Sequence, residues 1–156
     1  MIKIKIVVIG KDKDKWLSDG CAHYIKLLSR FAKAELKIIP ALKSSASLSP
    51  LEIKKKEGLL IKKEFDKDSY IALSDKGQQH DSLSFANWLE KQQIHCKGSM
   101  AFIIGGAYGL ADDILKKANH VISLSPLTFS HQLVRLVLLE QLYRAFSIIH
   151  GTDYHK

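Results

Sequence analysis

Two groups of residues in the last third of the chain have side chains that could take part in acid–base or nucleic-acid chemistry. His131 and Arg135 are four residues apart, which places them on one face of a helix. The chain ends with Tyr154, His155 and Lys156: an aromatic ring, a base that titrates near neutral pH and a cation. Proteins use such side chains to stack on bases, move protons and hold phosphates. These residues are therefore candidates for chemistry on a polyanion.

A glycine-rich turn follows the most apolar short segment of the chain. Residues 100–104 read MAFII, which is typical of a strand buried on both faces, and Gly105, Gly106 and Gly109 come directly after them. Glycine allows close approach of the backbone to a ligand, and open α/β sheets bind ligands beyond the carboxyl ends of their strands. From this pattern alone, both a ligand-binding loop and a simple tight turn remain open.

The common nucleotide and metal motifs are absent from the sequence. A dinucleotide fingerprint would need glycine where Ile104 stands, and no Gly-Lys-Ser/Thr of a phosphate-binding P-loop follows Gly109. His150, Asp153 and His155 lie near one another but lack a recognised ligand spacing. Cys21 and Cys96 form no C-x-x-C pair, and we interpret them as reduced thiols. We therefore expect neither a metal site nor a disulfide.

Composition and charge indicate a soluble protein with a polyanionic partner. The 156 residues are 46% hydrophobic and 26% charged, which suits one globular domain spanning residues 1–156. The formal net charge of +8 favours a nucleic acid, although charge alone leaves RNA, DNA and anionic lipid open. No apolar stretch has the length of a membrane span, and the amino terminus lacks a signal-peptide pattern. We expect a cytoplasmic protein without a membrane partner.

Predicted strands and helices alternate along the chain. Hydrophobic periodicity predicts strands at residues 2–9, 36–39, 70–73, 101–104 and 121–124, with a helix after each. The second helix begins with a capping box, Ser49 and Glu52 around Pro50, and Ser130 can cap the fifth. After the third strand, residues 74–77 read as a small polar turn. The alternation predicts an α/β fold with a mainly parallel sheet of five or six strands and helices on both faces.

The fifth predicted helix, residues 131–149, is apolar nearly all the way round. Such a helix must be covered on more than one side. Complete burial within one small chain would need more layers than five helices usually provide. We therefore predict a twofold homodimer packed through this helix.

Three segments closely resemble the bacterial RlmH family. They are IGGAYGL at residues 104–110, SLSPLTFSHQLVRLVLLEQLYRAFSI at residues 123–148, and YHK at residues 154–156. Proteins of that family are ribosomal RNA methyltransferases of the SPOUT superfamily, which methylate N3 of a pseudouridine in 23S rRNA with S-adenosylmethionine. The resemblance implies a carboxyl-terminal trefoil knot and a site built by two subunits, with no metal and no DNA partner.

The resemblance also assigns residues to the site. The methyl donor would lie against Leu73, the glycine turn of Gly105, Gly106 and Gly109, and the segment after the fifth strand: Leu124, Ser125, Pro126, Leu127, Thr128 and Phe129.

For the reaction itself, His155 would be the base, and Tyr154 would stack on the target or donate a hydrogen bond. Arg135 would stabilise an anionic oxygen or hold phosphate, His131 would orient either group, and Lys156 would hold phosphate. Structural roles stay open for two of them: a helix-start hydrogen bond for His131 and an ion pair in the dimer for Arg135.

The chain departs from the family pattern at Ala107, Tyr108, Ser130 and Asp153, which concerns substrate positioning more than reaction class. Three other functions compete: a SPOUT methyltransferase acting on tRNA, a non-enzymatic RNA-binding factor in ribosome assembly, and a flavodoxin-like nucleotide binder. Within the favoured reading, the substrate could be free RNA, the large subunit or the assembled ribosome.

Overall fold

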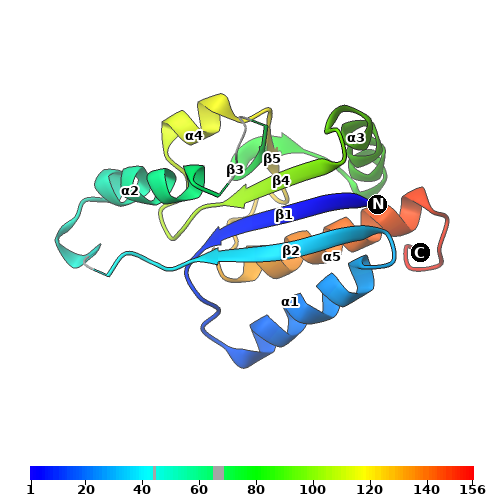
Figure 1. The fold of residues 1–156 in the computed structure, drawn as a ribbon, viewed down its shortest axis with the longest axis horizontal. Coiled ribbons are helices and arrows are strands. Elements are labelled where there is room, and N and C mark those ends of the chain that lie inside the picture. The colour runs from blue at the N-terminus through cyan, green and yellow to red at the C-terminus, as the bar shows by residue number, and fades with distance from the viewer. Residues whose placement is uncertain (44, 65–68) are drawn as a thin grey trace.

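The computed structural model describes residues 1–43, 45–64 and 69–156. Strands and helices alternate along the chain (Figure 1). Their bounds are β1 Ile2–Ile9, α1 Lys15–Leu28, β2 Ala32–Ile39, the 3-10 turn η1 Ser45–Ser47, α2 Pro50–Lys62, β3 Ile71–Gln79, α3 Ser82–His95, β4 Ser99–Ile104, α4 Asp112–Lys117, β5 His120–Ser123 and α5 Leu133–Ile149.

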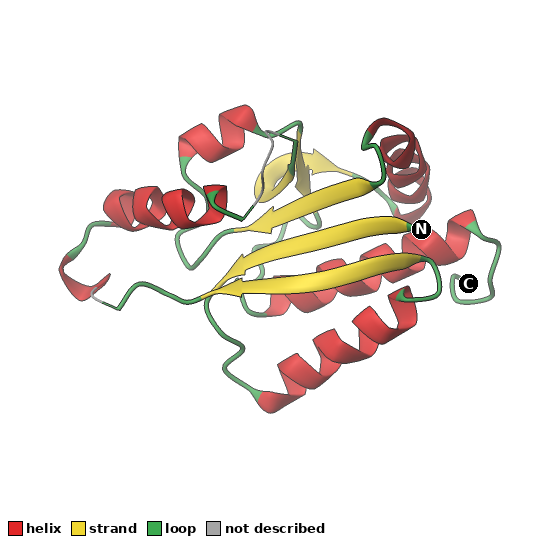
Figure 2. Ribbon diagram, in the orientation of Figure 1, coloured by secondary structure: helices red, strands yellow, loops and turns green. Residues whose placement is uncertain are grey.

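The five strands form one sheet in the order β2-β1-β4-β3-β5 (Figure 2). All pairs of neighbouring strands are parallel, which confirms the predicted parallel α/β fold. β4 lies between β1 and β3 and bonds to both, so the carboxyl ends of β1, β3 and β4 lie at the same edge. The glycine turn after β4 therefore emerges in the middle of that edge, where open parallel sheets bind ligands.

Helices cover both faces of the sheet (Figure 1), as predicted. One face packs against α1, α3 and α5 through a large apolar core, with Leu17, Leu89 and Phe146 among its buried members. The other face packs against α2 and α4 through a smaller core that includes Ile61 and Ile114. The sheet is thus the middle of three layers, and its central strands are apolar on both sides.

Two predicted boundaries in the strands are wrong. β2 begins at Ala32 rather than residue 36, because it pairs with β1 along its whole length, from Ile2 opposite Ala32 to Ile9 opposite Ile39. The expected turn at residues 74–77 is a bulge within β3. Leu73 and Gln78 both lie opposite Ile122 of β5, so the residues between them leave the ladder and β3 continues to Gln79.

The helix starts follow their capping chemistry. Ser49 Oγ accepts from the Glu52 amide, and Glu52 Oε2 accepts from the Ser49 amide, which confirms the predicted capping box at α2. Ser130 Oγ accepts from the Leu133 amide at the start of α5. α2 ends at Lys62, with Lys63 as its C-cap residue.

α5 packs between α1 and α3 on one face of the sheet. Eight of its 17 residues are buried in the single chain, and the other nine are half-buried. The helix is therefore better covered within one chain than its apolar sequence indicated. Among the described residues, no helix combines the length and hydropathy that crossing a bilayer requires.

Candidate functional site

A cavity of about 490 Å³ opens at the carboxyl edge of the sheet, where three chain segments meet. They are the bulge of β3 with Leu73, the glycine turn after β4, and the loop after β5. Of the predicted donor-site residues, the cavity is lined by Leu73, Gly105, Gly106, Gly109, Leu124, Ser125, Leu127, Thr128 and Phe129. Only Pro126 stands outside the lining. Predicted residues that are far apart in the sequence thus surround one space.

The glycine turn is shaped by close backbone contacts. The Gly109 amide donates to the Gly106 carbonyl oxygen over 3.0 Å, and Gly109 has a φ of +82°, which favours glycine. A Cβ at Gly105 would lie 2.5 Å from the carbonyl carbon of Gly109. The segment is therefore a tight turn that also lines the cavity, and ligand binding by this loop stays a prediction.

The bulge of β3 forms the opposite wall. Ser74 and Asp75 leave the ladder and line the cavity beside Leu73. Gly77 brings the chain back, since a Cβ there would lie 2.5 Å from the Ile122 carbonyl carbon. Sequence reasoning treated this segment as a simple turn and missed Ser74 and Asp75 as lining residues.

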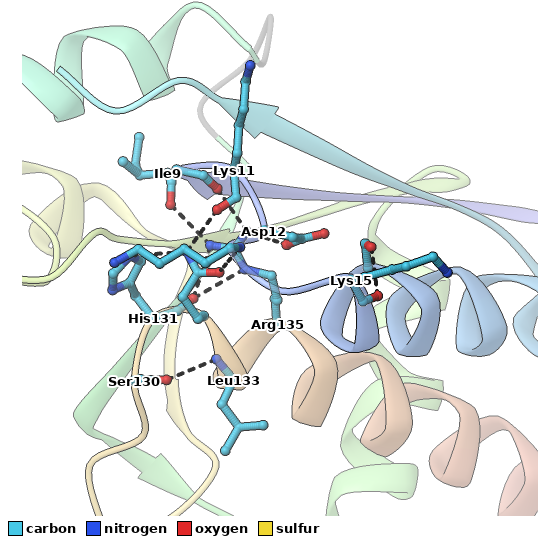
Figure 3. Close-up of polar contacts among 12 residues, drawn as sticks. Ile9, Lys11, Asp12, Lys15, Ser130, His131, Leu133 and Arg135 are labelled. Carbon is cyan, nitrogen blue, oxygen red and sulfur yellow. Dashed lines mark hydrogen bonds and ion pairs between the residues drawn. The ribbon is translucent and has the colours of Figure 1, made fainter. Parts of the chain in front are cut away.

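Arg135 lies under this edge of the sheet with its side chain fully buried (Figure 3). All five guanidinium N–H groups donate to acceptors of the same chain: the backbone oxygens of Ile9, Gly10 and His131, the last of which accepts twice, and Asp12 Oδ1 at 2.8 Å. No donor remains for RNA or for an anionic substrate. Within this chain Arg135 is a structural clamp between the β1 end and α5, and the roles expected of it in phosphate binding and in the reaction stay predictions.

His131 is half-buried and lines the cavity (Figure 3). Burial lowers the pKa of its imidazole, and the positive charges of Arg135 and Lys13 lower this pKa further. The ring is therefore neutral at pH 7 and has one nitrogen that can accept a hydrogen bond. The structure thus brings the His131 ring to the predicted donor site, whereas the Arg135 side chain is turned toward backbone oxygens and Asp12 and does not line the cavity.

The carboxyl-terminal residues lie at the other end of α5. Tyr154 Oη donates to Glu140 Oε1 over 3.0 Å and lies 3.3 Å from Tyr24 Oη. Burial and these two hydrogen bonds raise the pKa of Tyr154, so the phenol is protonated at neutral pH and acts as a donor. Its ring packs edge-on against Tyr143.

His155 is held by Arg144, which in turn pairs with Glu140 at 2.6 Å. The distance from Arg144 Nη1 to His155 Nδ1 is 3.3 Å, and because arginine only donates, Nδ1 is the acceptor. Lys156 is exposed at the chain end. The i, i+4 spacing of Glu140 and Arg144 indicated an ion pair, but no sequence signal linked that pair to the tail.

The tail and the cavity of one chain do not meet. Arg135 contacts the carboxyl end of β1, whereas Arg144 and the tail lie roughly 13 Å further along the helix axis, toward the amino ends of the strands. Tyr154, His155 and Lys156 therefore cannot act on a molecule in the cavity of their own chain in this arrangement.

Glu57 is a buried acid that sequence reasoning missed. It lies on α2 with a residue exposure of 7%, and its carboxylate lies against Gly106 of the glycine turn. Burial raises the pKa of Glu57, and the Gly106 backbone amide offsets this only in part. The signal was in the sequence, because Ile53, Glu57 and Ile61 recur every four residues and so share the buried stripe of the helix. In the described part of the chain, no cluster of three or more His, Cys, Asp or Glu residues could hold a metal ion.

Comparison with known proteins gives one consistent family. The family described as "Predicted SPOUT methyltransferase" matches residues 2–155. The "Ribosomal RNA large subunit methyltransferase H" of Lactobacillus delbrueckii subsp. bulgaricus is 45% identical over 159 residues, covering 99% of this chain and 100% of that protein. The protein of the same name from Bacillus thuringiensis is 43% identical over the same coverage.

Two solved structures share the fold at low sequence identity. A probable methylase family protein from Haemophilus influenzae has a TM-score of 0.57 and 14% identity, covering 98% of this chain and 70% of that chain. A probable methyltransferase from Bordetella pertussis has a TM-score of 0.54 and 12% identity, covering 92% and 95%.

Proposed function

Because this chain belongs to the SPOUT methyltransferase family, which it matches over residues 2–155, we propose that it transfers a methyl group from S-adenosylmethionine to N3 of a pseudouridine in 23S rRNA. Its relatives are named as ribosomal RNA large subunit methyltransferases and match it over their full length. The observation that carries the proposal is the cavity at the carboxyl edge of the sheet, where predicted donor-site residues from three separate segments line one space.

The lining residues fit the donor. The glycine turn supplies backbone amides and carbonyls without side chains in the way, since a Cβ at Gly105 would collide with Gly109. Leu73, Leu124 and Phe129 supply apolar walls for a flat purine. When bound there, S-adenosylmethionine would supply an electrophilic methyl group on a positively charged sulfur.

The acceptor requires a proton to be removed. N3 of pseudouridine carries a proton between two carbonyl groups and becomes a good nucleophile only when that proton leaves. His155 is the proposed base once the target replaces Arg144 at its Nδ1. Tyr154 stacks on the target or exchanges its hydrogen bond to Glu140 for one to the target, and Lys156 holds phosphate. His131, neutral and beside the cavity, orients the target or accepts from it. Arg135 supports this arrangement by fixing the segment that carries His131.

In a homodimer, the tail of one subunit could reach the cavity of the other, which it cannot reach within one chain. We propose that the tail of each subunit completes the cavity of its twin, and that the partner covers the half-buried side of α5. The trefoil knot expected from the family belongs to the same proposal, formed by the glycine turn and the loop after β5.

Mixing two inactive variants tests the composite site. His155→Ala should nearly abolish turnover while S-adenosylmethionine affinity by calorimetry stays unchanged, and Gly105→Ala should abolish donor binding because its Cβ collides with Gly109. After subunit exchange, half of the molecules carry one intact site, so the mixture should recover about a quarter of wild-type turnover. No recovery would mean that each chain works alone.

Nucleoside mass spectrometry of RNA from a deletion strain tests the substrate. Loss of one methylated pseudouridine from 23S rRNA is the expected result, whereas loss from tRNA would assign the enzyme to the competing substrate. A protein that binds rRNA but shows no calorimetric signal with S-adenosylmethionine would instead be a non-enzymatic RNA-binding factor.

A further inference from the structure

A second cavity, of about 620 Å³, adjoins the donor cavity. Gly106, Ala107, Tyr108 and His131 line both spaces, so the two cavities adjoin at the glycine turn and His131. A molecule in the second cavity would therefore lie beside a donor in the first. No residue of the sequence prediction other than Gly106 and His131 lines the second cavity.

Glu57 is the acid that lines the second cavity. Its residue exposure is 7%, and Oε2 is buried without a hydrogen-bond partner among the described residues. A buried polar atom of this kind costs stability unless a ligand satisfies it. Oε2 is therefore an unused acceptor for a ligand that brings an N–H or O–H group.

The other walls suit a flat, polar ring attached to phosphates. Pro40, Leu42 and Ile53 give an apolar lining, and Tyr108, 55% exposed, offers an aromatic face at the junction of the two cavities.

Two exposed lysines, Lys11 and Lys13, lie at this cavity in a fixed loop. The Gln132 side chain donates to the Lys11 carbonyl oxygen and accepts from the Lys13 amide. Cations held in this way attract a nucleic-acid backbone.

From these observations we propose that the second cavity receives the target base and that Glu57 reads the N1–H by which pseudouridine differs from uridine. In pseudouridine the ribose is attached to carbon, so N1 keeps a proton next to the C2 carbonyl, whereas in uridine N1 carries the ribose. The N1–H would donate to Glu57 Oε2, the buried oxygen that lacks a partner. N3 lies on the far side of C2 and remains available for methylation. This inference rests on the proposed function.

The discrimination follows from the cost of leaving Glu57 unpaired. Uridine in the same position would bury the carboxyl without a partner, and sites that hydrogen-bond a substrate N–H or O–H strongly reject analogues that lack it. Glu57 is therefore a specificity residue, whereas His155 remains the proposed base.

The test compares two substrates and three variants. The substrates are ribosomes that carry unmethylated pseudouridine at the target position and matched ribosomes that carry uridine there, with kcat/KM measured for each. The variants are Glu57→Met, which removes the polar group at similar volume, Glu57→Gln, which keeps an acceptor oxygen, and Glu90→Met, which removes an exposed acid on α3. Calorimetry with S-adenosylmethionine and urea unfolding accompany each variant.

Glu57→Met should lower the preference for pseudouridine over uridine by at least about tenfold, while Glu57→Gln and Glu90→Met keep it. Donor affinity should stay within about twofold of wild type in all three, since Glu57 lines only the second cavity.

A Glu57→Met protein with the wild-type preference overturns the inference alone. Equal losses on both substrates together with weaker donor binding also overturn it, because Glu57 would then only support the glycine turn. A wild-type protein that methylates neither ribosome overturns the proposed function and this inference with it.

Discussion

Arg135 shows how much of the site edge depends on one buried cation. Its guanidinium fixes the Ile9 and Gly10 carbonyls, Asp12 and the first turn before α5 at once. The side chain is fully buried and its partner Asp12 is nearly so. Arg135 thus connects the end of β1, the first strand of the chain, to the helix that carries the tail. Arg135 and Gly10 are 125 residues apart in the sequence.

Arg135→Met should destabilise the protein by about 3–5 kcal/mol, because it leaves Asp12 and two carbonyls buried without their donor. Urea unfolding measures the loss. The control Lys15→Met breaks the exposed pair with Asp19 and should cost less than about 1 kcal/mol. If both variants unfold at the same urea concentration, Arg135 is not the clamp described above.

Glu57 makes stability depend on pH in a defined direction. Burial raises its pKa above the ordinary 4.5, so the folded protein holds this proton more tightly than the unfolded chain. The stability that this proton contributes is fully present below the unfolded pKa of 4.5 and is lost as the pH rises through the folded pKa. A glutamine at this position does not titrate and keeps its stability over the same range.

We expect Glu57→Gln to be more stable than wild type at neutral pH, and the two to converge below about pH 4, where the carboxyl is protonated in both states. Unfolding free energies measured across this range check the prediction. Glu90→Gln, on the surface of α3, should show no such divergence. Parallel curves for Glu57→Gln and wild type would contradict a raised pKa at Glu57.

At the scale of elements, the bulge of β3 sets the shape of the donor cavity. Residues 74–77 leave the ladder while Leu73 and Gln78 stay opposite Ile122. Gly77 permits the return because a Cβ there would lie 2.5 Å from the Ile122 carbonyl carbon. The position of this one glycine therefore couples the packing of β3 on β5 to two walls of the cavity.

Gly77→Ala should separate β3 from β5, costing about 1–3 kcal/mol and weakening S-adenosylmethionine binding in parallel. Urea unfolding and calorimetry measure the two effects. Gly98→Asn is the matched control, since Gly98 has a positive φ that asparagine tolerates and open space where a Cβ would lie. Unchanged donor affinity in a destabilised Gly77→Ala protein would show that the bulge does not shape the cavity.

Local sequence signals identified the elements but not their neighbours. The apolar run before Gly105, the capping box at Ser49 and the apolar run of residues 131–149 each act within a few residues. The strand and the two helices predicted from them are present in the structure, whereas the homodimer predicted from the last run stays a prediction. The position of β4 between β1 and β3 depends on pairing between distant segments, which alternation of elements does not specify.

The sequence predicted those residues of the candidate site that a local pattern identifies. It did not predict the contacts that depend on residues far away in the sequence. The strand-end residues of the donor cavity came from the glycine pattern and from the family resemblance. The i, i+4 spacing of His131 and Arg135 placed them on one face, but the acceptors that saturate Arg135 come from β1 and the loop after it. Glu57 could have been found as the one acid in the buried stripe of α2.

For the whole molecule, the net charge of +8 predicts a strong dependence of RNA binding on salt. Log Kd for ribosomes should rise linearly with log salt concentration. Replacing Lys11 and Lys13 by glutamine should reduce the slope by about 1 to 2, because each phosphate contact contributes about 0.7 to 0.9. Replacing Lys26 and Lys91, exposed on α1 and α3, should change the slope less. Equal reductions of the slope in both double variants would mean that the RNA does not contact Lys11 and Lys13 in preference to other exposed lysines.

The central position of β4 also determines when a newly made chain can fold. Residues 1–98 contain β1, β2 and β3 but lack the strand that joins β1 to β3. Synthesis proceeds at roughly 5–20 residues per second, so several seconds pass between the emergence of β1 and that of β4. During that interval the inner edges of β1 and β3 are unpaired and open to other chains, and the nascent protein is most exposed to aggregation before its hundredth residue.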